Sequence, residues 1–117
     1  MDITIAQNGK ITTLTISGKV DVEHIERLED TLSDLIKKDC HFLIIDCQDV
    51  DYLSSKGMHA FLHAQKELEK NHGKIFFVSF CPAVLEVLEN AGIAKYFQTY
   101  DSSREAYNEM LQVIESV

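Results

Sequence analysis

Two adjacent serines, Ser54 and Ser55, followed by Lys56 and Gly57, are the residues of this chain whose types and spacing best suit a chemical role. They stand where an apolar strand pattern gives way to a helical one, a junction that exposes a hydroxyl at the mouth of a sheet. The amides of a helix's first turn and its positive end stabilise a phosphate placed there. A serine at a helix start is most often a cap, but this pair also predicts a phosphorylation site that leaves the helix folded.

Acidic residues precede the serines without forming the motif of an enzyme. Asp49 and Asp51 fall in a loop predicted over residues 47–55 and are best explained as solvated acids. A receiver-type phosphoacceptor site needs an acidic pair after the first strand and a lysine after a late one, and neither is present. The chain also lacks a glycine-rich phosphate loop, a nucleophile elbow and a Cys/His pair. We therefore expect no enzymatic activity and no cofactor.

His59, His63 and Glu67 recur every four residues and so share one face of the predicted second helix. Two histidines at this spacing can ligate a metal ion. However, the third side chain lies two turns from the first, too far for one ion without ligands from other elements. We expect this face to be solvated and metal-free, with His59 belonging to a partner surface next to Ser55.

The elements that position these residues alternate along the chain. Asn8-Gly9 between two strand patterns indicates a hairpin, and Asp21 is the expected N-cap of the first helix. Gly73 is the expected left-handed residue that ends the second helix. The predicted strands are Ile3–Ile5, Ile11–Ile16, Phe42–Asp46, Ile75–Val78 and Tyr96–Thr99. The predicted helices start at Asp21, near the pair Ser54-Ser55, at Pro82 and at Ser102. The third has core positions Val84, Val87, Leu88 and Ala91, and the last has Ala106, Met110, Val113 and Val117.

This order, β-β-α-β-α-β-α-β-α, predicts an α/β fold with a mixed sheet, an N-terminal hairpin and about four packed helices. The functional loops of such a sheet gather beyond the carboxyl ends of its strands. Here those loops are residues 18–21, 47–55 and 79–82, so Asp21 is expected close to the serines. With 117 residues and no linker or repeat, the chain is expected to form one domain over residues 1–117.

The charge and the cysteines exclude several classes of partner. Eleven basic and 19 acidic residues leave a net charge of −8, which disfavours nucleic acids and anionic lipids. No apolar run is long enough to span a bilayer, and the first residues lack the features of a signal peptide. The three cysteines, Cys40, Cys47 and Cys81, fit neither a CxxC pair nor a zinc site. We expect reduced thiols in a cytoplasmic protein.

Four motifs occur together and in order: Gly18–Asp21, Phe42–Asp46, Tyr52–Met58, and Pro82–Val84 followed by Ala91–Ile93. In these motifs the chain resembles the STAS domain of bacterial anti-sigma-factor antagonists. The counterparts in that family are a G-x-[LV]-D turn, an apolar strand ending in an acid, a D-S-[ST]-G-[LM] signature and a P-x-V helix closed by x-G-[LI]. The resemblance extends over essentially the whole chain.

The resemblance implies that Ser55 is the serine phosphorylated by an anti-sigma kinase, with Ser54 as a competing acceptor. It departs from the family at Ser54, where an Asp is usual, and at Lys56, where a small residue is usual. The phosphosite environment it implies comprises Asp21, Asp46, Lys56 and Gly57. The partner-binding residues it implies are Asp21, Val22, Ser54, Ser55, Lys56, Met58 and His59.

A physical mechanism accompanies this assignment. Phosphorylation adds about −1.5 to −2 charges, and an unpaired charge buried at an interface costs about 4 kcal/mol, nearly a thousandfold in affinity. The leading hypothesis is therefore an anti-sigma-factor antagonist that binds an anti-sigma factor/serine kinase when Ser55 is free and is reset by a serine phosphatase. The alternatives are an unphosphorylated STAS adaptor of a sensory or lipid-transport complex, and a small-molecule-binding or enzymatic domain. The sequence does not indicate an oligomeric state.

Overall fold

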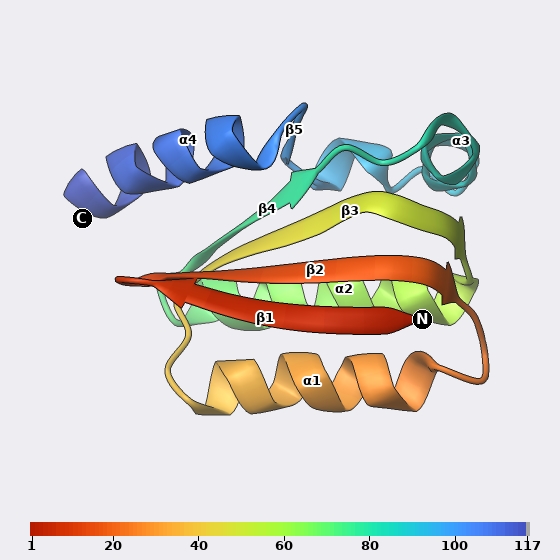
Figure 1. The fold of residues 1–117 in the computed structure, drawn as a ribbon, viewed down its shortest axis with the longest axis horizontal. Helices are drawn as coiled ribbons and strands as arrows, with labels where there is room; N and C mark the ends of the chain where they lie inside the picture. Colours follow the sequence, from red (N-terminus) through yellow and green to blue (C-terminus); the bar gives the residue numbers. More distant parts are fainter. Residues whose placement is uncertain (117) are drawn as a thin grey trace.

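The computed structural model describes residues 1–116, which form one five-stranded sheet with helices on both faces (Figure 1). The strands lie in the order β1-β2-β3-β4-β5, with β1 antiparallel to β2 and the other neighbours parallel. The predicted α/β class, mixed sheet and N-terminal hairpin are confirmed. The elements are β1 (Asp2–Asn8), β2 (Ile11–Val20), α1 (Ile25–Lys37), β3 (Phe42–Leu53), α2 (Ser55–Lys70), β4 (Lys74–Val78), α3 (Pro82–Asn90), a 3-10 turn η1 (Ala94–Tyr96), β5 (Thr99–Tyr100) and α4 (Ser103–Glu115).

Two unequal cores hold the layers together. The larger lies between one face of the sheet and helices α1, α2 and α3, with Leu14, Leu43, Phe61 and Phe77 almost fully buried. The smaller lies between the other face and α4. It contains Ile11, Phe42, Ile44, Phe76, Val78, Ala106 and Met110. Residues 42–45 of β3 are buried on both faces, as the uninterrupted apolar run predicts.

Local sequence signals set several element boundaries as expected. Gly9 has φ +61° in the β1–β2 turn, a conformation that glycine adopts without strain. Pro82 occupies the first turn of α3. The Ser102 hydroxyl accepts a hydrogen bond from the backbone N–H of Glu105 at 3.1 Å, which caps α4. Each of these signals involves residues that are only a few positions apart, so the sequence alone reveals them.

Two residues expected to cap or end a helix do not have those roles. Helix α1 begins at Ile25, after His24, so Asp21 lies before the helix and is not its cap. At the end of α2, His72 rather than Gly73 has the positive φ, at +63°. Glycine is needed at position 73 for a different reason. A Cβ there would lie 2.3 Å from the carbonyl oxygen of His41 and 2.9 Å from that of Leu68.

Strand β3 runs seven residues beyond Asp46, so Asp49 and Asp51 lie on a strand and not in the predicted loop. Residues 47–53 pair with β2 alone, with two register shifts, while β4 stops opposite Asp46. Their mixed polar composition hid this extension, because only Cys47, Val50 and Leu53 of these residues are buried.

The C-terminal elements also differ in detail from the predicted ones. The expected strand at 96–99 is a 3-10 turn followed by a strand of two residues, Thr99–Tyr100. Val87 and Ala91 are exposed, whereas Val84 and Leu88 are buried as expected. Ala106 and Met110 are buried and Val113 is half-buried. The predicted core position Val117 lies outside the described residues.

Candidate functional site at the start of helix α2

The two serines have different environments because α2 begins between them. Ser54 is the N-cap: its hydroxyl accepts a hydrogen bond from the backbone N–H of Gly57 at 3.1 Å. Its own N–H donates to the carbonyl of Val20 at 2.9 Å, and the residue is only 8% exposed. Ser55, the first residue of the helix, is exposed. Of the two hydroxyls, that of Ser55 is therefore the accessible one.

The helix start is pressed against the ends of β2 and β3, and Gly57 permits this approach. A Cβ at position 57 would lie 2.7 Å from a methyl of Leu53 and 2.9 Å from a methyl of Val20. Because Gly57 has no side chain, the first turn of α2 sits directly on the strand ends. The ends of both strands consequently support one side of this first turn, and its other side faces solvent.

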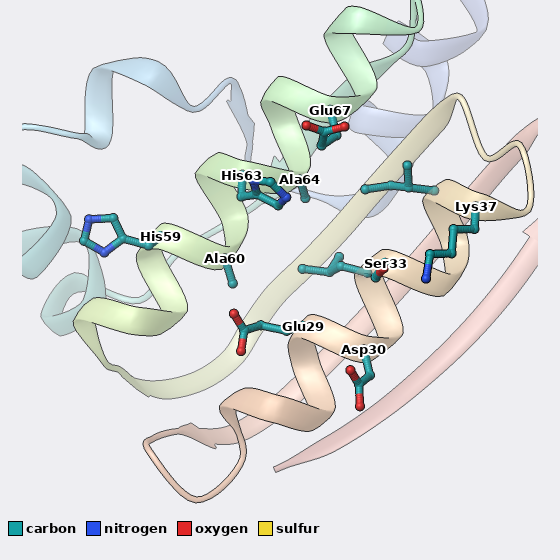
Figure 2. Close-up of a pocket in the computed structure, with 11 residues that line it drawn as sticks. Glu29, Asp30, Ser33, Lys37, His59, Ala60, His63, Ala64 and Glu67 are labelled. Atoms are coloured by element: carbon teal, nitrogen blue, oxygen red, sulfur yellow. The ribbon is translucent and has the colours of Figure 1, made fainter.

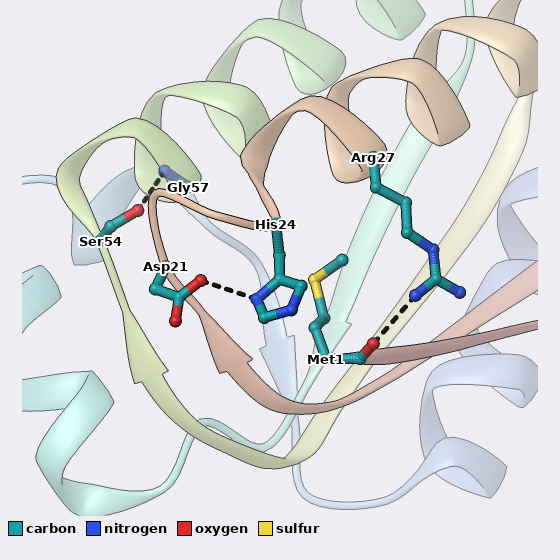
Figure 3. Close-up of polar contacts among 6 residues, drawn as sticks. All are labelled: Met1, Asp21, His24, Arg27, Ser54 and Gly57. Carbon is teal, nitrogen blue, oxygen red and sulfur yellow. Dashed lines mark hydrogen bonds and ion pairs between the residues drawn. The ribbon is translucent and has the colours of Figure 1, made fainter.

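Asp21 is close to this helix start, as expected from the strand order, although it does not cap α1 (Figure 3). It follows Val20, whose carbonyl bonds to Ser54. Its carboxylate pairs with the His24 ring nitrogen Nδ1 at 2.6 Å. Desolvation acts to raise the pKa of Asp21, but the hydrogen bond and charge of His24 outweigh it and hold that pKa below its usual range. His24, which sequence analysis did not single out, thus orients the Asp21 carboxylate beside the start of α2.

The remaining predicted contact residues divide by exposure. Val22 is 68% exposed, and Lys56 and His59 are also exposed. The His59 ring nitrogen Nδ1 lies 2.8 Å from the Ser55 carbonyl oxygen, so it donates to that oxygen. Met58 is 6% exposed and packs into the core. A rigid partner therefore cannot contact Met58 to any large extent.

Tyr52 is a surface residue that sequence analysis used only as part of a motif. It is 49% exposed on β3, two residues before Ser54. With Val22 it provides large apolar surface near Ser55, and such residues are favoured at interfaces. Simple alternation along the strand does not give this exposure, because Asp51 and Tyr52 are both exposed between the buried Val50 and Leu53.

Asp46 is not brought to the helix start. It lies seven residues before the end of β3, about 20 Å along a strand. One carboxylate oxygen accepts from the backbone N–H of Gln48 at 3.0 Å, and the other accepts from the Ser103 hydroxyl at 2.9 Å. Asp46 therefore joins β3 to the start of α4. Asp46 was expected near the helix start because the predicted strand ended there. In the structure β3 continues to Leu53, so Asp46 lies well before the strand end.

The histidine face of α2 borders a groove of about 570 Å³ between α1 and α2 (Figure 2). Its lining combines the apolar residues Leu32, Ile36, Ala60 and Ala64 with the polar residues Glu29, Asp30, Ser33, Lys37, His59, His63 and Glu67. His59 and His63 are exposed, as expected. Within residues 1–116, no three His, Cys, Asp or Glu side chains are placed to hold one metal ion.

The thiols take no part in this site. Cys47 is buried, and desolvation, together with the charge of Asp46, raises the pKa of its thiol. Cys40 and Cys81 are half-buried, and all three are free. Across the described residues, no helix combines the length and the apolar character that a membrane crossing requires.

Comparison with known proteins identifies the family to which this fold belongs. The family model described as "STAS domain" matches residues 2–106. The chain belongs to the STAS domain family. A curated relative, "Putative anti-sigma factor antagonist BtrV" of Bordetella bronchiseptica, is 28% identical over 106 residues, covering 91% of this chain and 90% of the relative.

Solved structures agree with the family assignment at the level of fold. The unphosphorylated form of the anti-sigma factor antagonist SpoIIAA superposes with a TM-score of 0.83 and 17% identity, covering 95% of this chain and 97% of that one. The phosphorylated form, from Bacillus, gives a TM-score of 0.74 and 16% identity, with coverages of 92% and 98%. A sulfate transporter family protein from Wolinella succinogenes gives 0.79 and 18%, with coverages of 94% and 92%. The STAS fold thus occurs in regulators and in transporter proteins.

Proposed function

We propose that this STAS protein is an anti-sigma-factor antagonist that binds an anti-sigma factor with serine kinase activity through the start of α2. The partner is bound while Ser55 is unmodified. Phosphorylation of Ser55 releases it, a serine phosphatase restores binding, and sigma-factor-dependent transcription follows the state of this one residue. The curated relative and the structural neighbour SpoIIAA carry the name of this class, and SpoIIAA has been described in both phosphorylation states.

The observation that carries the proposal is that the two serines differ in exposure and in hydrogen bonding. Ser54 is buried and caps α2, whereas Ser55 is exposed on the first turn. Because Ser54 and not Ser55 supplies the cap, Ser55 can be modified without loss of the hydrogen bond that starts the helix. A phosphate on Ser55 would also lie at the positive end of α2, which favours it.

The surroundings of Ser55 suit a switch based on charge. Val22 and Tyr52 offer apolar surface near it, and this surface is compatible with a desolvated interface. A new phosphate in such an interface costs about 4 kcal/mol, nearly a thousandfold in affinity, if it stays unpaired. Lys56 is exposed beside Ser55 and supplies a counter-charge that softens this penalty.

The proposal is tested by binding of the cognate anti-sigma kinase, measured by calorimetry. Unmodified protein and Ser55→Ala should bind alike, and Ser55→Glu should bind at least tenfold more weakly. The loss should be larger when Lys56→Ala is added. Ser116→Glu places the same charge on an exposed residue beyond α4 and serves as the matched control. Equal weakening by Ser55→Glu and Ser116→Glu would exclude a local switch.

Intact-mass analysis of protein from its native cells tests the modification itself. A phosphorylated fraction is expected in the natural sequence and should disappear in Ser55→Ala. Persistence of that fraction in Ser55→Ala would assign the phosphate elsewhere. Absence of phosphate under all growth conditions would favour the second candidate, an unswitched STAS adaptor, for which the likeness to a sulfate transporter family protein is the supporting observation.

A further inference from the structure

Strand β1 forms an open edge of the sheet (Figure 1). It is seven residues long and pairs with β2 on one side only, whereas the opposite edge strand, β5, has two residues. Residues 4–8 of β1 are all exposed. A row of backbone N–H and C=O groups is therefore available along β1 for pairing with another strand.

This edge lacks the features that normally prevent strand addition. Edge strands are usually protected by proline, lysine, a bulge or short length. β1 contains neither proline nor lysine, and its pairing with β2 runs from Asp2 to Asn8 without a register shift. Its one charged residue, Asp2, is at its end. Ile5, at its centre, is 53% exposed.

The β1–β2 hairpin determines which backbone groups point outward. Its turn has two residues, Gly9 and Lys10, between the paired Asn8 and Ile11. In such a turn the flanking residues are hydrogen-bonded to each other, and along an antiparallel pair the bonded residues alternate. The N–H and C=O groups of alternate residues, Ile3, Ile5 and Gln7, therefore point away from β2.

We propose that two copies of this chain pair antiparallel along β1, about a two-fold axis at Ile5, and form a continuous ten-stranded sheet. This register places outward-facing residues opposite one another: Ile5 opposite Ile5, and Ile3 opposite Gln7. It also pairs Thr4 with Ala6 and Asp2 with Asn8. No two charges of like sign are opposed, so the edge is complementary to itself, as a two-fold interface requires.

The dimer is expected to be weak and to be strengthened by salt. One added strand pair buries less than the roughly 1,200 Å² of a standard interface, so we expect a dissociation constant on the order of 100 µM. Each copy carries a net charge of −8, and the two copies repel one another. Raising the ionic strength screens this repulsion and should tighten the dimer.

In this dimer both Ser55 residues stay accessible and lie far from each other. Gly18 of β2 lies against the start of β1, because a Cβ built on it would be 3.5 Å from Met1. Val20 bonds to Ser54, so β1 starts at the same end of the molecule as α2. Antiparallel pairing of β1 therefore places the two α2 starts at opposite ends of the dimer. The inference does not depend on the proposed function of Ser55.

Sedimentation equilibrium of the full chain tests the proposal, over about 10 µM to about 1 mM protein. A monomer–dimer equilibrium that tightens at about 0.5 M salt is expected. Ile5→Lys should weaken it at least tenfold, while Leu111→Lys, which places a lysine on the 39% exposed Leu111 of α4, should not. A protein that stays monomeric over this whole concentration range would overturn the proposal. This holds even if β1 pairs with a strand of a different protein. Equal effects of the two substitutions would also overturn it.

Variants with one accessible cysteine test the register, in a background of Cys40→Ser and Cys81→Ser that keeps the buried Cys47. Ile5→Cys places the two thiols opposite each other, at the spacing of directly paired residues. Gln7→Cys separates them by four residues, about 13 Å. Mild oxidation should produce a disulfide-linked dimer from Ile5→Cys and little from Gln7→Cys. Equal yields from both variants, or a greater yield from Gln7→Cys, would refute the two-fold axis at Ile5.

Discussion

Ser54→Ala is the substitution that most directly tests how the start of α2 is held. The Ser54 hydroxyl accepts the hydrogen bond from Gly57 N–H, and both residues are buried. Removal of an N-cap serine costs about 1 kcal/mol, and leaving a buried N–H without a partner brings the loss toward about 2 kcal/mol. For a chain of this size, a loss of about 1.5 kcal/mol lowers the melting temperature by about 6 °C.

Urea denaturation followed by circular dichroism measures this loss, provided that the slope of the transition stays unchanged. Ser55→Ala is the matched control, because the exposed Ser55 side chain makes no hydrogen bond in the described structure, and it should change the stability by less than about 0.5 kcal/mol. Ser54→Asp should retain most of the stability, since a carboxylate also caps a helix and favours its positive end. If Ser55→Ala is as costly as Ser54→Ala, the assignment of the cap to Ser54 is wrong.

Two further predictions concern positions where sequence analysis gave a wrong reason or missed a partner. Gly73→Ala should destabilise the fold by about 2 kcal/mol or more, because its Cβ would meet the backbone carbonyl of His41. A neutral result in the same urea assay would contradict this. Asp21 has a lowered pKa in the folded state, so its contribution to stability is present above its ordinary value of 3.8 and is lost as the pH falls through the lower, folded value. Asp21→Asn should therefore lose less stability than the natural sequence on acidification below 3.8, and an equal loss in both proteins would refute a role for the His24 pair.

Much of the candidate site could be predicted because it depends on local signals. The helix start at the serine pair and the nearness of Asp21 follow from a strand, a turn and a helix read in order, whereas only the structure shows that Ser54 is the cap. The position of Asp46 could not be predicted in this way. It depends on how far β3 continues, and this is decided by pairing with a distant part of the chain.

The sequence by itself determined the alternation of strands and helices, the hairpin, the cap at Ser102 and the family motifs. These features depend on periodicity and on hydrogen bonds between residues close in the chain. Only the tertiary structure decided that β3 extends to Leu53, that Asp46 bonds to Ser103 and that β1 is an open edge. The physical reason is the same in each case. Strand length, edge position and long-range polar contacts are set by partners that are remote in sequence, and a local pattern does not specify them.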